Sequence, residues 1–282
     1  MANVTIAQLQ ARKARGEKIT VLTAYDYPMA KVLDEAGVDL ILVGDSLGMV
    51  VLGYETTADV TMAEMLHHAK AVRRGVARAL VVGDMPLEAL RGSREESVRD
   101  AKRFRDEAGC DAVKVEWREG IDGTARAIVA AGVPVMGHVG LTPQTAAGEG
   151  GYGIRAKDAA SAARVVAQAQ ALQEAGCFAM VLECVPGVVA QEITKRLSIP
   201  TIGIGSGPSC DGQVVVTYDL IGLFERFKPR FVKRYGNVAD VIRQAADAYI
   251  RDVQSGAFPG QEHTVAMAPD EYARLKQALS LR

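Results

Sequence analysis

The chain has 282 residues, 49% of them hydrophobic, and its 33 basic and 34 acidic residues give a formal net charge of −1 at pH 7. A nearly neutral chain without a basic cluster gives no electrostatic sign of a nucleic-acid or anionic membrane partner. No apolar run approaches the roughly 20 residues of a membrane helix. The polar first 20 residues lack a signal-peptide core. We therefore expect a cytoplasmic protein with no membrane and no nucleic-acid partner.

Eight strand-like segments alternate with helix-like segments along the chain. Strands are expected at residues 19–24, 40–44, 80–83, 112–116, 133–137, 179–183, 201–204 and 231–234. Helices are expected at residues 28–36, 62–74, 94–108, 159–175 and 188–197. Most strand segments are continuous Val, Ile and Leu runs, which is typical of parallel strands buried on both faces.

An Ala-Gly pair closes four helix-like segments, and a strand follows each pair at once. The glycines are Gly37, Gly109, Gly132 and Gly176, and glycine just past a helix end supplies a left-handed cap without steric cost. The repeat indicates βα units. We predict a single (β/α)₈ TIM barrel over residues 1–282, with a short N-terminal helical extension. An open doubly wound sheet is the alternative, but eight strands without a long linker favour the closed barrel.

Five of the apolar runs end in ionisable groups. These are Asp45, Asp84, Glu116 with Lys114 two residues before it, His138 and Glu183. The carboxyl ends of the strands carry the active site in a (β/α)₈ barrel. The sequence therefore predicts a ring of functional side chains at this end.

Asp45 and Asp84 follow neighbouring strands, which lie roughly 4.8 Å apart in a sheet. Both side chains can then reach one cation, and carboxylate oxygens are the ligands that Mg²⁺ prefers. We interpret the pair as a metal site. The alternative for either residue alone is a structural cap for a neighbouring loop.

The other ionisable groups each have a functional and a structural interpretation. Lys114 and Glu116 point the same way from one strand. In the functional interpretation, Lys114 holds a substrate anion, and Glu116 lies in the outer shell of the metal or orients a metal-bound water. A salt bridge at the rim is the alternative. His138 can donate to a developing oxyanion, or be a satisfied core residue. Glu183 is the preferred general base, or a carboxylate bonded to the turn at residues 184–187.

Two connections, residues 46–61 and 140–157, are too long for plain turns. Long loops on the active face are often lids or substrate clamps, and surface decoration is the alternative. The run from Gly203 to Gly207 does not match G-x-G-x-x-G. We interpret it as the turn after strand 7, with phosphate binding left open. The four cysteines show no C-x-x-C spacing, so neither zinc nor disulfides are expected.

Several runs resemble ketopantoate hydroxymethyltransferase (3-methyl-2-oxobutanoate hydroxymethyltransferase). They are Gly44–Met49, Gly53–Thr57, Asp84–Pro86, Gly137–Gln144, Leu182–Pro186, Gly203–Gly207, Cys210–Gln213 and Phe231–Tyr235. They span nearly the whole chain in the right order.

The resemblance implies a (β/α)₈ barrel that uses Mg²⁺ and 5,10-methylenetetrahydrofolate to convert 3-methyl-2-oxobutanoate to 2-dehydropantoate, on the path to pantothenate and coenzyme A. It implies that Asp45 and Asp84 are metal ligands, with Glu116 near the metal. Ser46 and Lys114 would contact the oxo acid, as would Asp45 and Asp84 through their metal. His138 matches the active-site histidine and Glu183 the proton acceptor. The family is commonly decameric, so a homo-oligomer is expected.

Two segments depart from the family pattern. Trp117 stands where the family usually has a small residue after strand 4, and the loop at residues 148–157 differs from the common form. These changes bear on loop closure and substrate preference. Three other functions stay open from the residues themselves: a folate-independent, Mg²⁺-dependent carbon–carbon lyase or mutase acting on a 2-oxo acid, an inactive binding or scaffold protein, and an aldolase with a Schiff base on Lys114.

Overall fold

Eight parallel strands form a closed barrel in the computed structural model, which describes residues 3–149, 151–227 and 229–280. The strands pair in chain order and β8 closes on β1. Their bounds are β1 Ile19–Thr23, β2 Leu40–Val43, β3 Leu80–Asp84, β4 Ala112–Glu116, β5 Val135–Gly140, β6 Ala179–Glu183, β7 Thr201–Ile204 and β8 Gly212–Val215. The predicted (β/α)₈ barrel is confirmed, and the open sheet is wrong.

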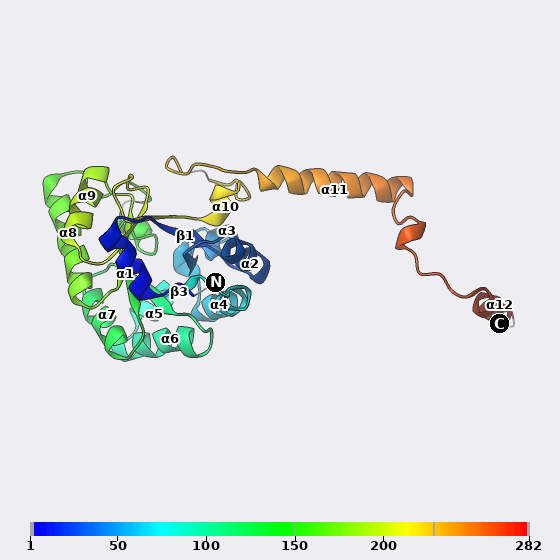
Figure 1. Cartoon of the computed structure of the whole chain (residues 1–282), viewed down its shortest axis with the longest axis horizontal. Coiled ribbons are helices and arrows are strands. Elements are labelled where there is room, and N and C mark those ends of the chain that lie inside the picture. The colour runs from blue at the N-terminus through cyan, green and yellow to red at the C-terminus, as the bar shows by residue number, and fades with distance from the viewer. Residues whose placement is uncertain (1–2, 150, 228, 281–282) are drawn as a thin grey trace. The chain divides into compact units, whose positions relative to one another are not determined.

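Helices alternate with the strands and lie around them (Figure 1). They are α1 Ile6–Arg15, α2 Tyr27–Glu35, α3 Leu47–Val50, η1 Thr57–Asp59, α4 Met62–Gly75, α5 Leu87–Arg91, α6 Arg94–Asp106, α7 Ile121–Ala130, η2 Ala146–Glu149, α8 Ala159–Glu174, α9 Gly187–Arg196 and α10 Thr217–Leu220. Reciprocal capping boxes begin α1, α4, α6 and α8. Each box satisfies two backbone N–H groups that the first turn leaves without partners.

The four repeated Ala-Gly pairs act as predicted. Gly37, Gly109, Gly132 and Gly176 have φ angles of 92°, 70°, 81° and 98°. A residue with a Cβ adopts this left-handed region only with strain, so glycine suits each of these turns. The same short signal therefore turns the chain from helix to strand at four places around the barrel.

The predicted eighth strand at residues 231–234 is wrong. This segment forms a turn in which Val232 N donates to Pro229 O at 3.1 Å, and β8 is instead Gly212–Val215, paired with both β7 and β1. The apolar character of Phe231 and Val232 has another cause, since both line the central cavity. The fifth strand also differs, because it begins after Pro134, which has no N–H to donate, and runs on to Gly140.

Alternation along the strands divides the core in two. On β2, Leu40 and Leu42 pack with side chains inside the barrel, while Ile41 and Val43 pack in the larger core against the helices. The inner group also receives Leu9 of α1. Ion pairs of 2.8 Å from Arg12 to Asp39 and from Lys13 to Asp211 hold α1 to the barrel.

Residues 236–282 form a second compact unit, separate from residues 1–235. It contains α11 (Val238–Ser255), η3 (Gln261–His263) and α12 (Pro269–Ser280). Many of its apolar side chains are exposed, including Val241, Ile242, Tyr249 and Leu279. The single domain over residues 1–282 stays a prediction. Among the residues that the structure describes, no helix is both long and apolar enough to cross a membrane.

Candidate active site

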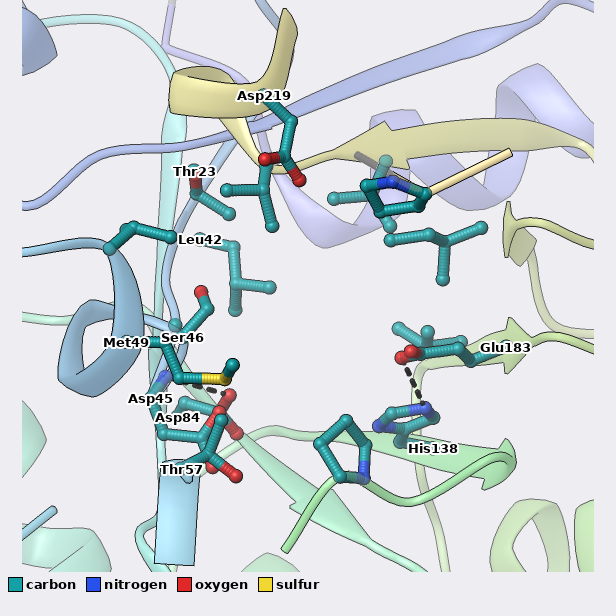
Figure 2. Close-up of a pocket in the computed structure, with 18 of the residues that line it drawn as sticks. Thr23, Leu42, Asp45, Ser46, Met49, Thr57, Asp84, His138, Glu183 and Asp219 are labelled. Atoms are coloured by element: carbon teal, nitrogen blue, oxygen red, sulfur yellow. Dashed lines mark hydrogen bonds and ion pairs between the residues drawn. The ribbon is translucent and has the colours of Figure 1, made fainter. Parts of the chain in front are cut away.

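A cavity of about 390 Å³ opens among the ends of the strands and the loops that follow them (Figure 2). All seven side chains selected from the sequence line it: Asp45, Ser46, Asp84, Lys114, Glu116, His138 and Glu183. Cavities of this size are typical of small-molecule sites. The structure therefore brings together in one place residues that span 139 positions of the chain (45 to 183).

Strand register explains why so many of these side chains converge. Along β4, Lys114 and Glu116 occupy the same face as Ala112, which packs inside the barrel. Across the sheet, Asp84 pairs with Lys114, and Glu116 pairs with His138. Because side chains alternate between the faces of a strand, these inward positions continue the core upward as a layer of polar groups.

Five charged or ionisable groups in this layer are almost wholly buried. Their exposed fractions are 4% for Asp45, 1% for Asp84, 4% for Lys114, 2% for Glu116 and 2% for His138. Burying a charge is costly unless it is paired or bound to metal. Three of these five groups are carboxylates, and only one of the five is a lysine that can balance their negative charge.

Lys114 is the cation at the centre of this group. Its Nζ lies 2.9 Å from Asp84 Oδ1 and 3.6 Å from Glu116 Oε1. Burial alone lowers a lysine pKa, but Asp84, Glu116 and Asp45 outweigh it and the pKa of Lys114 is raised. Lys114 therefore carries its charge, whereas a lysine that forms Schiff bases needs a lowered pKa. This observation disfavours the aldolase.

His138 links Lys114 to Glu183. Its Nδ1 lies 3.2 Å from Lys114 Nζ and 3.4 Å from Glu116 Oε1, and its Nε2 lies 3.2 Å from Glu183 Oε2 (Figure 2). A neutral ring that accepts from Lys114 through a bare Nδ1 carries its proton on Nε2, and a charged ring carries a proton on both nitrogens. In both of these forms Nε2 carries a proton at ion-pair distance from Glu183, without hydrogen-bond geometry in the described structure. Burial and Lys114 lower the pKa of His138, but Glu116 and Glu183 outweigh them and raise it.

Gln144, to which the sequence interpretation gave no role, ties the carboxylates together. Its Nε2 donates to Asp45 Oδ2 at 2.8 Å and to Met85 O at 2.9 Å, and its backbone N donates to Glu116 Oε2 at 3.0 Å. Gln144 belongs to the motif Gly137–Gln144, so its position in a matching run was the signal available from the sequence. The hydrogen bond to Asp45 joins residues 99 positions apart, so it could not be predicted without the fold.

Asp45 and Asp84 fit a divalent cation. Burial, followed by the charges of Asp84 and Glu116, raises the pKa of Asp45 well above its usual range, and burial raises the pKa of Asp84. Among the described residues, Asp84 Oδ1 has no hydrogen bond of good geometry, and the Lys114 ammonium lies 2.9 Å from it. Within the described residues, no three Asp, Glu, His or Cys side chains form a complete ligand set. Two carboxylates are what Mg²⁺ commonly takes from a protein, with water and substrate completing the shell.

Both long loops form part of the wall. Ser46, Met49 and Thr57 come from the first, and Pro143 and Tyr152 from the second. Tyr25 is fully buried, and its hydroxyl lies 2.9 Å from Ser46 Oγ. Their action as lids stays a prediction. Trp117 does not enter this wall and packs against the core on the helix side of the sheet.

Comparison with known proteins shows the family of the chain. The family model described as ketopantoate hydroxymethyltransferase matches residues 3–261. The chain is similar to 3-methyl-2-oxobutanoate hydroxymethyltransferase of Moorella thermoacetica, with 54% identity over 93% of this chain and 98% of that protein. The corresponding protein of Syntrophus aciditrophicus is 52% identical over 93% of this chain and 96% of its own length.

Solved structures with the same fold are more distant in sequence. A phosphonopyruvate hydrolase, crystallised with oxalate and Mg²⁺, has a TM-score of 0.60 and 16% identity over 98% of this chain and 99% of that one. A 2,3-dimethylmalate lyase of the PEP mutase/isocitrate lyase superfamily has a TM-score of 0.59 and 15% identity over 100% and 98%. These likenesses concern the fold alone. By sequence, over nearly its whole length, the chain belongs to the ketopantoate hydroxymethyltransferase family.

Proposed function

We propose that this protein catalyses the Mg²⁺-dependent transfer of a hydroxymethyl group from 5,10-methylenetetrahydrofolate to 3-methyl-2-oxobutanoate, giving 2-dehydropantoate and tetrahydrofolate. The proposal rests on one observation: all seven selected polar side chains line one cavity. The chain that carries them has relatives that are named for this activity. A layer of buried carboxylates, lysine and histidine is expensive to maintain, and function accounts for its cost.

The polar end of the cavity suits a 2-oxo acid. Lys114 presents a fixed positive charge there, and Ser46 offers a hydroxyl on the opposite loop. Without a further cation, the carboxylates of Asp45, Asp84 and Glu116 would repel an anionic substrate. We place the carboxylate and keto oxygen of the oxo acid at this end, beside Lys114 and Ser46.

A bound Mg²⁺ would supply the missing positive charge and withdraw electron density from the keto carbonyl, which acidifies the C3 proton. Asp45 and Asp84 would hold the ion. Gln144 keeps the Asp45 carboxylate oriented, and Glu116 stays in the outer shell, because Lys114, His138 and the Gln144 backbone already occupy its oxygens. Glu116 as a third direct ligand is not part of the proposal.

Glu183 is placed to take the C3 proton. It reaches the cavity from the end of β6, and in the view of Figure 2 it lies across from Asp45 and Asp84. His138 Nε2 lies at ion-pair distance, 3.2 Å, from the Glu183 carboxylate, and it has no hydrogen-bond partner among the described residues. In this proposal it donates to oxygen as negative charge develops there. The electron pair left on C3 forms the new carbon–carbon bond to the methylene carbon of the folate. The two carbon–nitrogen bonds of that methylene group break, a water molecule supplies the hydroxyl oxygen, and N5 and N10 of the released tetrahydrofolate take up the proton from C3 and the proton from water.

The competing functions make different predictions. Family membership favours folate chemistry over a folate-independent lyase or mutase, because the neighbours with such activities share only the fold, at 15–16% identity. An inactive scaffold protein would be expected to have a broken polar layer, whereas all seven selected residues line the cavity. We further propose a homo-oligomer, a decamer by family resemblance, located in the cytoplasm. The exposed apolar side chains of α11 and α12 are consistent with further burial in an assembly.

An assay with 3-methyl-2-oxobutanoate, with and without methylenetetrahydrofolate, tests the function directly. We expect 2-dehydropantoate to form only when both substrates and Mg²⁺ are present. Product formation or carbon–carbon cleavage that proceeds without folate would support a lyase or mutase. Trapping of the substrate on the protein by borohydride would revive the Schiff-base mechanism.

A further inference from the structure

We infer that Asp219 and the apolar wall beside it form the subsite for the pteridine ring of the folate, with the Asp219 carboxylate accepting hydrogen bonds from the N3–H and 2-amino edge of that ring. The inference rests on the proposed function, because it assumes that a folate enters this cavity. It assigns a specificity role to a residue that the reaction itself does not use.

The cavity of about 390 Å³ extends beyond the polar layer. A transfer between two substrates requires both in one cavity with their reacting carbons in contact. The oxo acid occupies the end built from Asp45, Asp84 and Lys114. The opposite end is lined by apolar side chains, among them Val214, Val216, Phe224, Phe231 and Val232. In Figure 2, Asp219 lies at this end, away from His138 and Thr57.

The backbone of β7 and its turn shapes this wall. Gly205 has a φ of 63°, and a Cβ on it would lie 2.8 Å from Cδ1 of Phe231. Glycine therefore permits the close contact that sets the Phe231 ring at the edge of the cavity. An apolar wall with aromatic side chains suits the flat face of a heterocycle, which stacks or packs on such surfaces.

Asp219 is held on a firmly anchored element. Thr217, two residues earlier on α10, donates from its Oγ1 to Thr23 O at 2.6 Å, and its backbone N donates to Thr23 Oγ1 at 3.0 Å. These bonds fix α10 to the end of β1. The Asp219 side chain is partly buried and lines the cavity. Within the described residues its carboxylate accepts no hydrogen bond from the protein, so its acceptor capacity is left for a ligand.

The chemistry of the two ends separates the two substrates. A carboxylate repels the anionic oxo acid and attracts a group that presents two hydrogen-bond donors side by side. The 2-amino-4-oxo pteridine ring has such an edge, formed by N3–H and the 2-amino group. Asp219 therefore favours the folate at the apolar end and disfavours the oxo acid there.

The Asp219→Asn variant tests this assignment with little change in shape. An amide keeps one acceptor but replaces the other with a donor that opposes a ligand donor. We expect the KM for methylenetetrahydrofolate to rise about 10–100-fold, the loss typical of a charge-assisted hydrogen bond. The KM for the oxo acid and the folate-independent exchange of its C3 proton should stay within twofold of wild type. Asp122→Asn on α7 is the matched control and should leave all three unchanged.

A ligand change completes the test. The affinity for tetrahydrofolate and for its 2-desamino analogue is measured with both proteins by calorimetry. Wild type should bind tetrahydrofolate more tightly than the 2-desamino analogue. The variant should lose most of this difference, because it lacks the ionised carboxylate that pairs with the 2-amino group; comparing two proteins with two ligands isolates that pair. If wild type requires folate but Asp219→Asn keeps the wild-type KM and preference, this inference is wrong and the proposed function stands. If wild type does not use folate, both are wrong.

Discussion

The two ends of the cavity treat buried charge in opposite ways. At the polar end, four carboxylates gather around Lys114 and His138, and their oxygens contact those groups or Gln144. At the apolar end a single carboxylate, that of Asp219, lies among Val and Phe side chains, and it accepts no hydrogen bond from the residues that the structure describes. Under the proposed function, the polar end carries out the reaction and the apolar end recognises the folate.

This contrast shows what each end lacks. At the polar end, burial and then neighbouring carboxylates raise the pKa values of Asp45 and Asp84, and the proposed cation would compensate the negative charge of the ionised groups. At the apolar end, burial raises the pKa of Asp219 to about 6, although Arg234 opposes this. Hydrogen-bond donors from a neutral ligand would be enough to satisfy it. The following predictions test the two ends in turn.

Replacing the proposed base should have the largest effect. Glu183→Gln keeps the shape of the side chain and removes its ability to take a proton. General acid–base catalysis contributes about 10²–10⁴-fold, so C3 proton exchange with deuterium oxide and turnover should fall together by that factor. Binding of the oxo acid should persist, because its contacts come from β2 to β4. Glu192→Gln on α9 is the control, because this partly exposed carboxylate pairs with Arg196 and does not line the cavity. Exchange at the wild-type rate would make His138 the next candidate base.

Removing a proposed metal ligand should lower turnover nearly as much. In Asp84→Asn, turnover should fall about 10³-fold, since Lewis-acid catalysis supplies several kcal/mol. Calorimetry should show weakened Mg²⁺ binding, and chelation of the wild-type protein should abolish activity until Mg²⁺ is restored. The control is Asp106→Asn, whose carboxylate pairs with Arg105 on the surface. Wild-type turnover in metal-free buffer would contradict the metal site.

Lys114→Met should affect substrate binding more than any other step. We expect the KM for the oxo acid to rise about 10–100-fold, as when a charged hydrogen-bond partner is lost. Thermal stability should fall as well, because removal of one member of a buried ion pair leaves Asp84 and Glu116 uncompensated. Lys70→Met, which breaks the exposed pair with Glu107, is the control. A loss of stability with an unchanged KM would make Lys114 a structural salt bridge only.

The sequence was sufficient where the signal was local. Ala-Gly pairs and apolar runs predicted seven of the eight strands, and strand ends predicted Asp84, Glu116 and Glu183. It failed at β8, where Gly212 and Gln213 interrupt the apolar pattern, while Phe231 and Val232 mimic a strand but line the cavity. Gln144 and Asp219 were missed because neither ends a strand. Their roles depend on contacts between segments far apart in the chain.

The smallest effect distinguishes Asp219 from the carboxylates of the polar end. Its pKa is raised from the ordinary 3.8 to about 6 by burial, with Arg234 and the hydroxyl of Tyr25 as ionisable neighbours. A raised carboxyl pKa means that the folded state binds the proton more tightly than the unfolded state. The ionised group therefore destabilises the fold above pH 6, and this cost disappears as the pH falls towards 4.

Asp219→Asn removes that cost without removing a hydrogen bond to the protein. The variant should be more stable than wild type at pH 7.5 by about 1 kcal/mol, after allowance for solvent screening of a partly exposed group, or about 2–4 °C in Tm. The two Tm values should converge as the pH is lowered from 6 to 4. Asp122→Asn controls for the substitution itself. A variant that is less stable at pH 7.5 would show that Asp219 supports the fold, and its place in a ligand subsite would then need another explanation.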